Sequence, residues 1–152
     1  MIVKTPVGDV SVGYIGGELV CEFGTLDVES DPPAKLIAQL QAYFAGTFVE
    51  QFDVPLPVST SFTSRCWEEC RKIPYGQTIT YAQLATRARS PKAARAAGQA
   101  MRHNPLVIIT PCHRVVATTG RLHGFAGNID PDSEELRRKH FLIQLENPTI
   151  RK

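Results

Sequence analysis

A cysteine and a histidine stand side by side in the segment Pro111-Cys112-His113-Arg114-Val115. A cysteine thiolate is a strong nucleophile, and a histidine can act as the base that removes the thiol proton. Neighbouring residues of an extended chain point to opposite faces, so a direct Cys112–His113 contact requires a turn there, or a bridging water molecule. A Cys-His pair in isolation is more often a buried thiol beside an unrelated histidine, so its meaning depends on its surroundings.

The charges of the chain are distributed unevenly around this pair. Residues 1–70 hold three basic and ten acidic side chains, whereas residues 71–121 hold nine Lys or Arg and no Asp or Glu. Residues 122–152 balance at five against five, so the net charge of +2 conceals the basic stretch. A positive field is expected to lower the pKa of a thiol, and it attracts a polyanion such as DNA. A run of charged residues is by itself more often only the solvent-facing side of helices, but this basic stretch surrounds a candidate nucleophile.

The first third of the chain has the pattern of a small sheet followed by a helix. Alternating apolar residues predict strands, and Gly16-Gly17 can supply the positive φ angles of a hairpin turn. Pro33 can begin a helix that runs to about Ala45. Two prolines within residues 53–60 predict a linker. We therefore expect an N-terminal α+β domain over residues 1–58.

Residues 59–152 are predicted to form a second, mostly helical domain. Thr80 is a good N-cap for a short helix through Arg87, and Ser90-Pro91 can begin another from Lys92 to about Arg102. Two short helices with a tight connection predict a helix-turn-helix. The expected fold class is thus α+β: a small N-terminal sheet-and-helix domain, then a mostly helical domain with a helix-turn-helix.

Two further elements are expected around the Cys-His pair. Asn104-Pro105 ends the second helix, and the apolar residues 106–109 predict a buried strand that leads into Cys112. Asp130-Pro131 has the form of an N-cap and first helical residue for a last helix, which runs to Glu146.

Composition narrows the class of protein. The chain is 43% apolar and 21% charged, which is typical of a globular core. We see no signal peptide and no apolar run long enough to span a membrane, so we expect a cytoplasmic protein, nucleoid-associated if bacterial, with reduced cysteines and no membrane partner.

Cys66 and Cys70 lie four residues apart, but Phe62 and Trp67 predict a core face there. We therefore expect no metal and no cofactor.

Further motifs precede the pair along the chain, densely from about residue 60 and more loosely upstream of that residue. They are Tyr43-Phe44, Gly46, Phe52, Pro55-Leu56-Pro57, Phe62, Trp67, Ile73-Pro74-Tyr75-Gly76, Thr80-Tyr81, Leu84-Ala85, Ala93-Ala94-Arg95-Ala96, Gly98 and Asn104-Pro105. With the Cys-His segment, these motifs resemble those of the O6-alkylguanine-DNA alkyltransferase family.

The resemblance implies a DNA-repair reaction. Proteins of this family transfer an alkyl group from O6 of guanine in DNA irreversibly to their own cysteine, so each molecule acts once. By similarity Cys112 is the acceptor, His113 is the base that acts through water, and Glu146 is the carboxylate partner. The implied partner is double-stranded DNA that carries O6-alkylguanine, bound through the minor groove, and we expect a monomer.

The resemblance also implies roles toward DNA. The damaged nucleotide must leave the duplex before a cysteine can reach it. Arg95 corresponds to the arginine that enters the stack in its place, and Tyr81 to the residue that rotates the nucleotide phosphate. Asn104 corresponds to a hinge asparagine between the recognition helix and the active-site strand. Phe125 and Ala126 are expected to contact the substrate.

The chain departs from the family in the substrate loop. Phe125 stands where a tyrosine is usual, which keeps the ring and removes a hydroxyl group. Ala126-Gly127-Asn128 stands where a serine and a Gly-Gly pair are frequent, and roughly seven extra residues precede Lys139. The insertion is acidic and predicts a longer helix or an acidic flap. It leaves Glu134 and Glu135 as competitors of Glu146 for the carboxylate role, and Glu146 ranks first because its spacing from Lys139 matches that of the family.

Two other functions remain open at this point. One is a protein that binds alkylated guanine without repairing it, although family-like proteins of that kind replace the cysteine. The other is a helix-turn-helix regulator with a redox-sensing cysteine, which would show sequence-specific footprints and reversible oxidation of Cys112.

Overall fold

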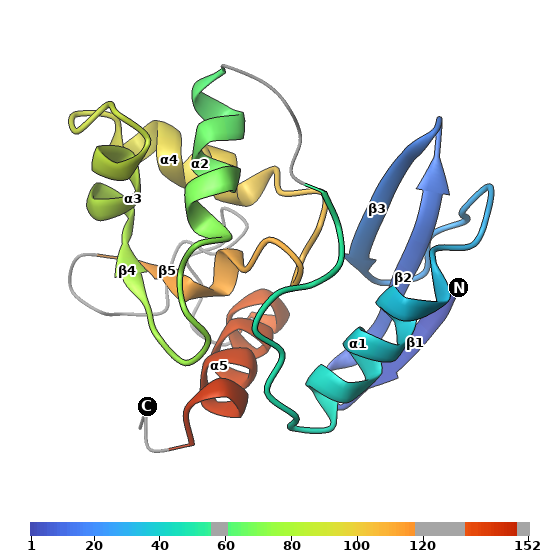
Figure 1. The fold of residues 1–152 in the computed structure, drawn as a ribbon. Helices are drawn as coiled ribbons and strands as arrows, with labels where there is room; N and C mark the ends of the chain where they lie inside the picture. Colours follow the sequence, from blue (N-terminus) through green and yellow to red (C-terminus); the bar gives the residue numbers. More distant parts are fainter. Residues whose placement is uncertain (56–60, 118–132, 149–152) are drawn as a thin grey trace.

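The structure is a computed structural model that describes residues 1–55, 61–117 and 133–148. A three-stranded sheet with one helix on its face lies on one side of the molecule, and a group of three helices lies on the other (Figure 1). The C-terminal helix lies between them. In chain order the elements are β1 (Ile2–Thr5), β2 (Gly8–Ile15), β3 (Glu18–Phe23), α1 (Ala34–Phe44), α2 (Phe62–Cys70), β4 (Ile79–Thr80), α3 (Tyr81–Arg87), α4 (Ala94–Arg102), the 3-10 helix η1 (Cys112–Arg114), β5 (Val115–Val116) and α5 (Glu134–Glu146). The α+β fold class and the order of sheet and helices are as expected.

The N-terminal sheet forms as its sequence pattern predicts. Its strands are antiparallel in the order β1-β2-β3, and Gly16 and Gly17 turn the hairpin between β2 and β3 with φ angles of 59° and 80°. Strand residues and helix α1 share one core, whose fully buried members include Val10, Val12, Cys21, Leu36 and Leu40. Ile108, Ile109 and Leu142 from the second half of the chain belong to the same core. The sheet therefore packs against the segment that precedes Cys112 and against α5.

The helix-turn-helix is present, with one boundary different from the prediction. Thr80 caps α3 as expected: its side chain accepts a hydrogen bond from the Gln83 backbone, and the Gln83 side chain returns one. Helix α4 begins at Ala94, two residues after the predicted start. The reason is that Ser90 and the next residues close a turn, in which the Ala93 N–H donates to the Ser90 carbonyl at 2.9 Å.

The strand predicted over residues 106–109 is wrong, although the burial of Ile108 and Ile109 is confirmed. The segment makes a single parallel bridge between Leu106 and Cys21 of β3 and then turns. The Val107 N–H donates to the Cys21 carbonyl, and the Thr110 N–H donates to the Leu106 carbonyl. The apolar residues therefore predicted the burial of this segment correctly. The segment does not continue as a strand, because it pairs with β3 at Leu106 only.

Helix α5 ends at Glu146 as predicted and begins later than predicted. Its N-cap is Ser133, whose side chain accepts a hydrogen bond from the Leu136 N–H at 3.2 Å. Asp130 and Pro131 lie outside the described residues.

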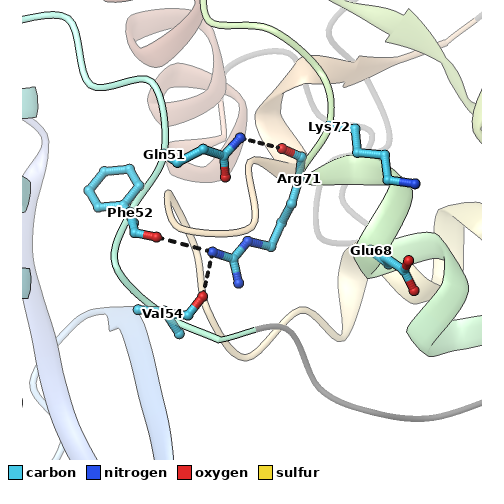
Figure 2. Close-up of a pocket in the computed structure, with 6 residues that line it drawn as sticks. All are labelled: Gln51, Phe52, Val54, Glu68, Arg71 and Lys72. Atoms are coloured by element: carbon cyan, nitrogen blue, oxygen red, sulfur yellow. Dashed lines mark hydrogen bonds between the residues drawn. The ribbon is translucent and has the colours of Figure 1, made fainter.

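A buried arginine joins the end of α2 to the segment that follows α1 (Figure 2). Arg71 is 6% exposed, and its Nη2 atom donates to the carbonyls of Phe52 and Val54 at 3.3 and 2.8 Å. Gln51 donates in turn to the Arg71 carbonyl at 3.1 Å. The pocket of Figure 2 lies at this junction and shares no residue with the Cys-His pair. The predicted boundary at residue 58 falls outside the described ranges and stays a prediction.

Candidate active site

Cys112 and His113 lie on η1, a single 3-10 turn between a buried loop and β5. The Cys112 N–H donates to the Thr110 carbonyl at 2.8 Å, and the Arg114 N–H donates to the Pro111 carbonyl at 2.9 Å. The turn that a functional Cys-His pair requires is thus present. Strand β5 follows at once and pairs in parallel with β4, which connects this turn to the start of α3.

The Cys112 thiol is almost completely buried, and this changes its expected acidity. Burial raises the pKa of Cys112 above its ordinary value, although a hydrogen bond from the Asn104 side chain and the positive charge of Lys139 lower it. The sequence led us to expect a net lowering by the basic stretch. That expectation is wrong because loss of hydration outweighs the nearby cation. Cys112 therefore rests as a thiol and needs a base to become a nucleophile.

His113 is suited to be that base. Burial lowers its pKa, and Arg114 and Lys139 lower it further, whereas Glu146 raises it; the net pKa lies below its ordinary value. Its Nε2 atom lies 2.6 Å from Oε2 of Glu146. An ionised carboxylate can only accept hydrogen bonds, so Nε2 carries the proton and Nδ1 is left with a lone pair. Nδ1 is buried and has no hydrogen-bond partner among the residues that the structure describes.

Glu146 is held by donors from three other parts of the fold. Arg114 donates through Nε to Oε1 at 2.7 Å and through Nη2 to Oε2 at 3.0 Å. The Gly76 N–H donates to Oε1 at 3.1 Å, and the Tyr43 hydroxyl donates to Oε2 at 2.6 Å. Burial raises the pKa of Glu146, but the charges and hydrogen bonds of His113 and Arg114 outweigh it and hold the pKa far below its usual range. The carboxylate is therefore ionised at neutral pH.

Lys139 is a buried cation whose charge acts on Cys112. Its side chain is fully buried, and Nζ donates to the Val115 carbonyl at 2.6 Å and to the Tyr81 hydroxyl at 3.3 Å. Burial lowers the pKa of Lys139 to about 8, against the opposing charges of Cys112 and Cys70. Burial, with Cys112 and Cys70, also raises the pKa of Tyr81 to about 12. Tyr81, predicted to act on DNA, thus has its hydroxyl anchored beside the thiol.

Asn104 connects α4 to the cysteine loop. Its side chain donates to the Thr110 carbonyl at 2.7 Å and accepts from the Leu106 N–H at 2.9 Å. Between these two contacts Ile108 has a φ of 71°, which a β-branched residue rarely adopts. The Asn104 bonds and the burial of Ile108 hold the loop in this shape. Asn104 is therefore placed where a hinge between helix and cysteine would have to be.

Arg95 lies apart from the buried site, on the exposed side of α4. Other exposed cations of the helix-turn-helix are Arg87, Arg89, Lys92 and Arg102. Arg71 and Arg114, from the same basic stretch, face inward and bind carbonyl and carboxylate groups. Of the nine cations of the stretch, five are thus exposed on α3, α4 and the turn between them, and two are buried. Lys72 is exposed after α2, and Arg121 lies outside the described residues.

Four further residues were predicted in or near the site: two of the substrate loop and two glutamates that compete with Glu146. Phe125 and Ala126 lie outside the described residues. Glu134 is exposed at the start of α5, where it pairs with Arg138 at 2.8 Å. Glu146, at the other end of the helix, is the carboxylate that meets His113.

Two residues of the cluster, Tyr43 and Lys139, were given no role in the site from the sequence. A detectable signal existed for Lys139: it precedes Glu146 by seven residues, which is two helical turns, so both face the same side of α5. Tyr43 stood in the apolar stripe of α1 and gave no sign that its hydroxyl would reach a residue 103 positions away. Arg114 braces the turn through its bonds to Glu146 and to the Ile73 carbonyl.

Within the described ranges, no three His, Cys, Asp or Glu side chains gather as a metal site would require. Nor is any helix in those ranges both long and apolar enough to cross a bilayer.

Known proteins resemble both the sequence and the fold. Residues 61–148 match the family model described as 6-O-methylguanine DNA methyltransferase, DNA binding domain. A methylated-DNA–protein-cysteine methyltransferase of Methanosarcina acetivorans is 45% identical over 71% of this chain, and one of Mycobacterium bovis is 45% identical over 72%. The alignments span 65% and 62% of those two proteins, which is less than two thirds of their own length.

The structure of the Mycobacterium tuberculosis O6-methylguanine methyltransferase aligns with 99% of this chain and 93% of its own at a TM-score of 0.75 and 34% identity. The Mycobacterium tuberculosis protein OGT in complex with DNA aligns with 97% of this chain and 91% of its own at a TM-score of 0.76 and 33% identity.

Proposed function

The chain belongs to the 6-O-methylguanine DNA methyltransferase family, and from this premise we propose that it repairs DNA by transferring an alkyl group from O6 of guanine to Cys112. The observation that carries the proposal is the buried chain of contacts that ends at the cysteine turn. Glu146 holds the Nε2 proton of His113, and the free lone pair of Nδ1 is the base.

The reaction is a displacement at the alkyl carbon. His113 takes the thiol proton of Cys112 at Nδ1 through a water molecule, and Glu146 stabilises the imidazolium that results. The positive charge of Lys139 and the Asn104 hydrogen bond stabilise the thiolate. The sulfur then forms a bond to the alkyl carbon while the bond from that carbon to O6 breaks, and the electron pair passes to guanine. The thioether is stable, so the protein is consumed.

We propose that the helix-turn-helix delivers DNA to this site through the minor groove. The exposed cations of α3–α4 suit binding to the phosphate backbone, which requires no sequence readout. Arg95 would replace the extruded base, Tyr81 would turn its phosphate, and Asn104 would couple α4 to the cysteine loop. Phe125 and Ala126 would contact the base. A monomer acting on the chromosome in the cytoplasm would suffice for this task.

The alternatives fit the site less well. A redox-sensing regulator needs an accessible cysteine of low pKa, whereas Cys112 is 3% exposed and its pKa is raised. A protein that only binds the lesion has no use for the His113–Glu146 pair.

Intact-mass measurement after incubation with a duplex that contains O6-methylguanine tests the proposal. One equivalent of methyl group should appear on the wild-type protein and none on Cys112→Ala. Cys21→Ala, which alters a buried thiol of the sheet, should accept the methyl group as the wild type does. If no methyl group is transferred, or if Cys112→Ala accepts one, the proposal is wrong.

A further inference from the structure

The proposed active-site carboxylate, Glu146, is also contacted by a residue from the first third of the chain. Tyr43 lies on α1, is completely buried, and donates its hydroxyl proton to Oε2 of Glu146 at 2.6 Å. The same hydroxyl lies 3.4 Å from Nε2 of His113. The ring is fixed by edge-on or tilted contacts with Phe44, Phe52 and Tyr75 at centroid distances of 5.3 to 6.2 Å.

This hydroxyl can act only as a donor toward Glu146. Burial and the charge of Glu146 raise the pKa of Tyr43 far above its usual range, so the hydroxyl keeps its proton at neutral pH. Five donor groups thus surround the carboxylate: the Tyr43 hydroxyl, His113 Nε2, Arg114 Nε and Nη2, and the Gly76 N–H. A carboxylate offers about four lone-pair positions, so these donors compete.

We propose that Tyr43 is a positioning residue for the alkyl transfer: it fixes Glu146 and, by sharing Oε2 with His113, weakens the stabilisation that Glu146 gives to the protonated imidazole. This inference rests on the proposed function and deepens it. It makes the N-terminal sheet-and-helix unit part of the active site, because α1 supplies the donor.

The consequence is a base that stays neutral. His113 faces Glu146 and Lys139 from α5, Arg114 from η1 and Tyr43 from α1. Glu146 raises the pKa of His113, whereas burial and the two cations lower it. Removal of the Tyr43 hydroxyl leaves Oε2 freer to bind the imidazolium, so the pKa of His113 should rise by about one unit.

The test is the single-turnover rate of methyl transfer between pH 5 and pH 8 for the wild type and Tyr43→Phe in the full chain. A protonated His113 cannot act as the base, so the acid limb of the profile should move to higher pH by about one unit. The deficit of the variant should therefore grow up to about tenfold between pH 8 and pH 5. Tyr75→Phe is the matched control, since it removes a neighbouring hydroxyl and keeps the ring; its acid limb should stay in place. A purely structural role for Tyr43 predicts instead a deficit that is equal at every pH.

A second readout does not depend on the reaction. The imidazole of His113, assigned by the signal missing in His113→Gln, can be titrated by NMR and should show the same upward shift in Tyr43→Phe. Replacement of Tyr43 by 3-fluorotyrosine, a stronger donor of similar size, should shift both midpoints downward and avoids a loss of folding. Unchanged midpoints in both variants would overturn the inference even if the rates fall. Failure of the wild type to accept a methyl group would instead refute the proposed function and leave the titration as the test of Tyr43.

Discussion

Substitution of Glu146 by glutamine tests whether the negative charge of the buried carboxylate, and not only the shape of the side chain, stabilises the folded protein. The side chain is 2% exposed and accepts hydrogen bonds from five donors, of which two belong to the Arg114 guanidinium. Glutamine offers one oxygen and turns an NH₂ group toward donors that already carry hydrogen atoms. Removal of one partner from a buried ion pair costs about 3–5 kcal/mol, because the remaining charge is left uncompensated. We expect Glu146→Gln to lose a free energy of unfolding of this size at pH 7.

Urea denaturation of the two proteins at several pH values gives the measurement. The pKa of Glu146 in the folded state lies far below its ordinary value of 4.5, so its contribution to stability is complete above about pH 4.5 and is lost as the pH falls toward the folded pKa. The difference between wild type and variant should therefore narrow by about 1.4 kcal/mol for each pH unit below that value. Glu134→Gln, on the same helix, removes an exposed ion pair and should cost at most about 1 kcal/mol. A loss below about 1 kcal/mol for Glu146→Gln, or a difference independent of pH, would refute the reasoning.

Two further substitutions separate the chemistry of the site from the stability of its support. Lys139→Gln removes the cation that lowers the pKa of Cys112, so the limb over which the methyl-transfer rate rises as the thiolate forms should move to higher pH, with the rate at pH 7 falling about tenfold for each unit; an unchanged limb would exclude an electrostatic role. Thr80→Ala removes the cap of α3 and should cost about 1 kcal/mol in urea denaturation. Thr86→Ala, at an exposed position farther along the same helix, should cost nothing, because alanine has the higher helix propensity; equal losses would contradict the capping assignment.

Local chemistry decided much of the fold, which is why the sequence predicted it. The Gly16-Gly17 turn, the Thr80 cap and the end of α4 before Asn104-Pro105 depend on neighbours within a few residues, and each is found as expected. The strand predicted over residues 106–109 depended on a partner edge, and β3 offers that edge to Leu106 alone. Its apolar residues therefore predicted burial correctly and conformation wrongly.

For the candidate site, too, the sequence predicted local features and did not predict those that depend on packing between elements. The sequence by itself determined which residues are the proposed nucleophile and base, and it placed the basic helix-turn-helix, because Cys112, His113 and the exposed arginines lie within one continuous stretch. Only the tertiary structure decided the acidity of these groups. Burial reverses the expected shift of the Cys112 pKa, and a lysine and a tyrosine from distant helices complete the surroundings of the cysteine and of Glu146. The physical reason is that hydration and charge–charge distances are set by packing between elements, and a pattern along one chain segment does not contain them.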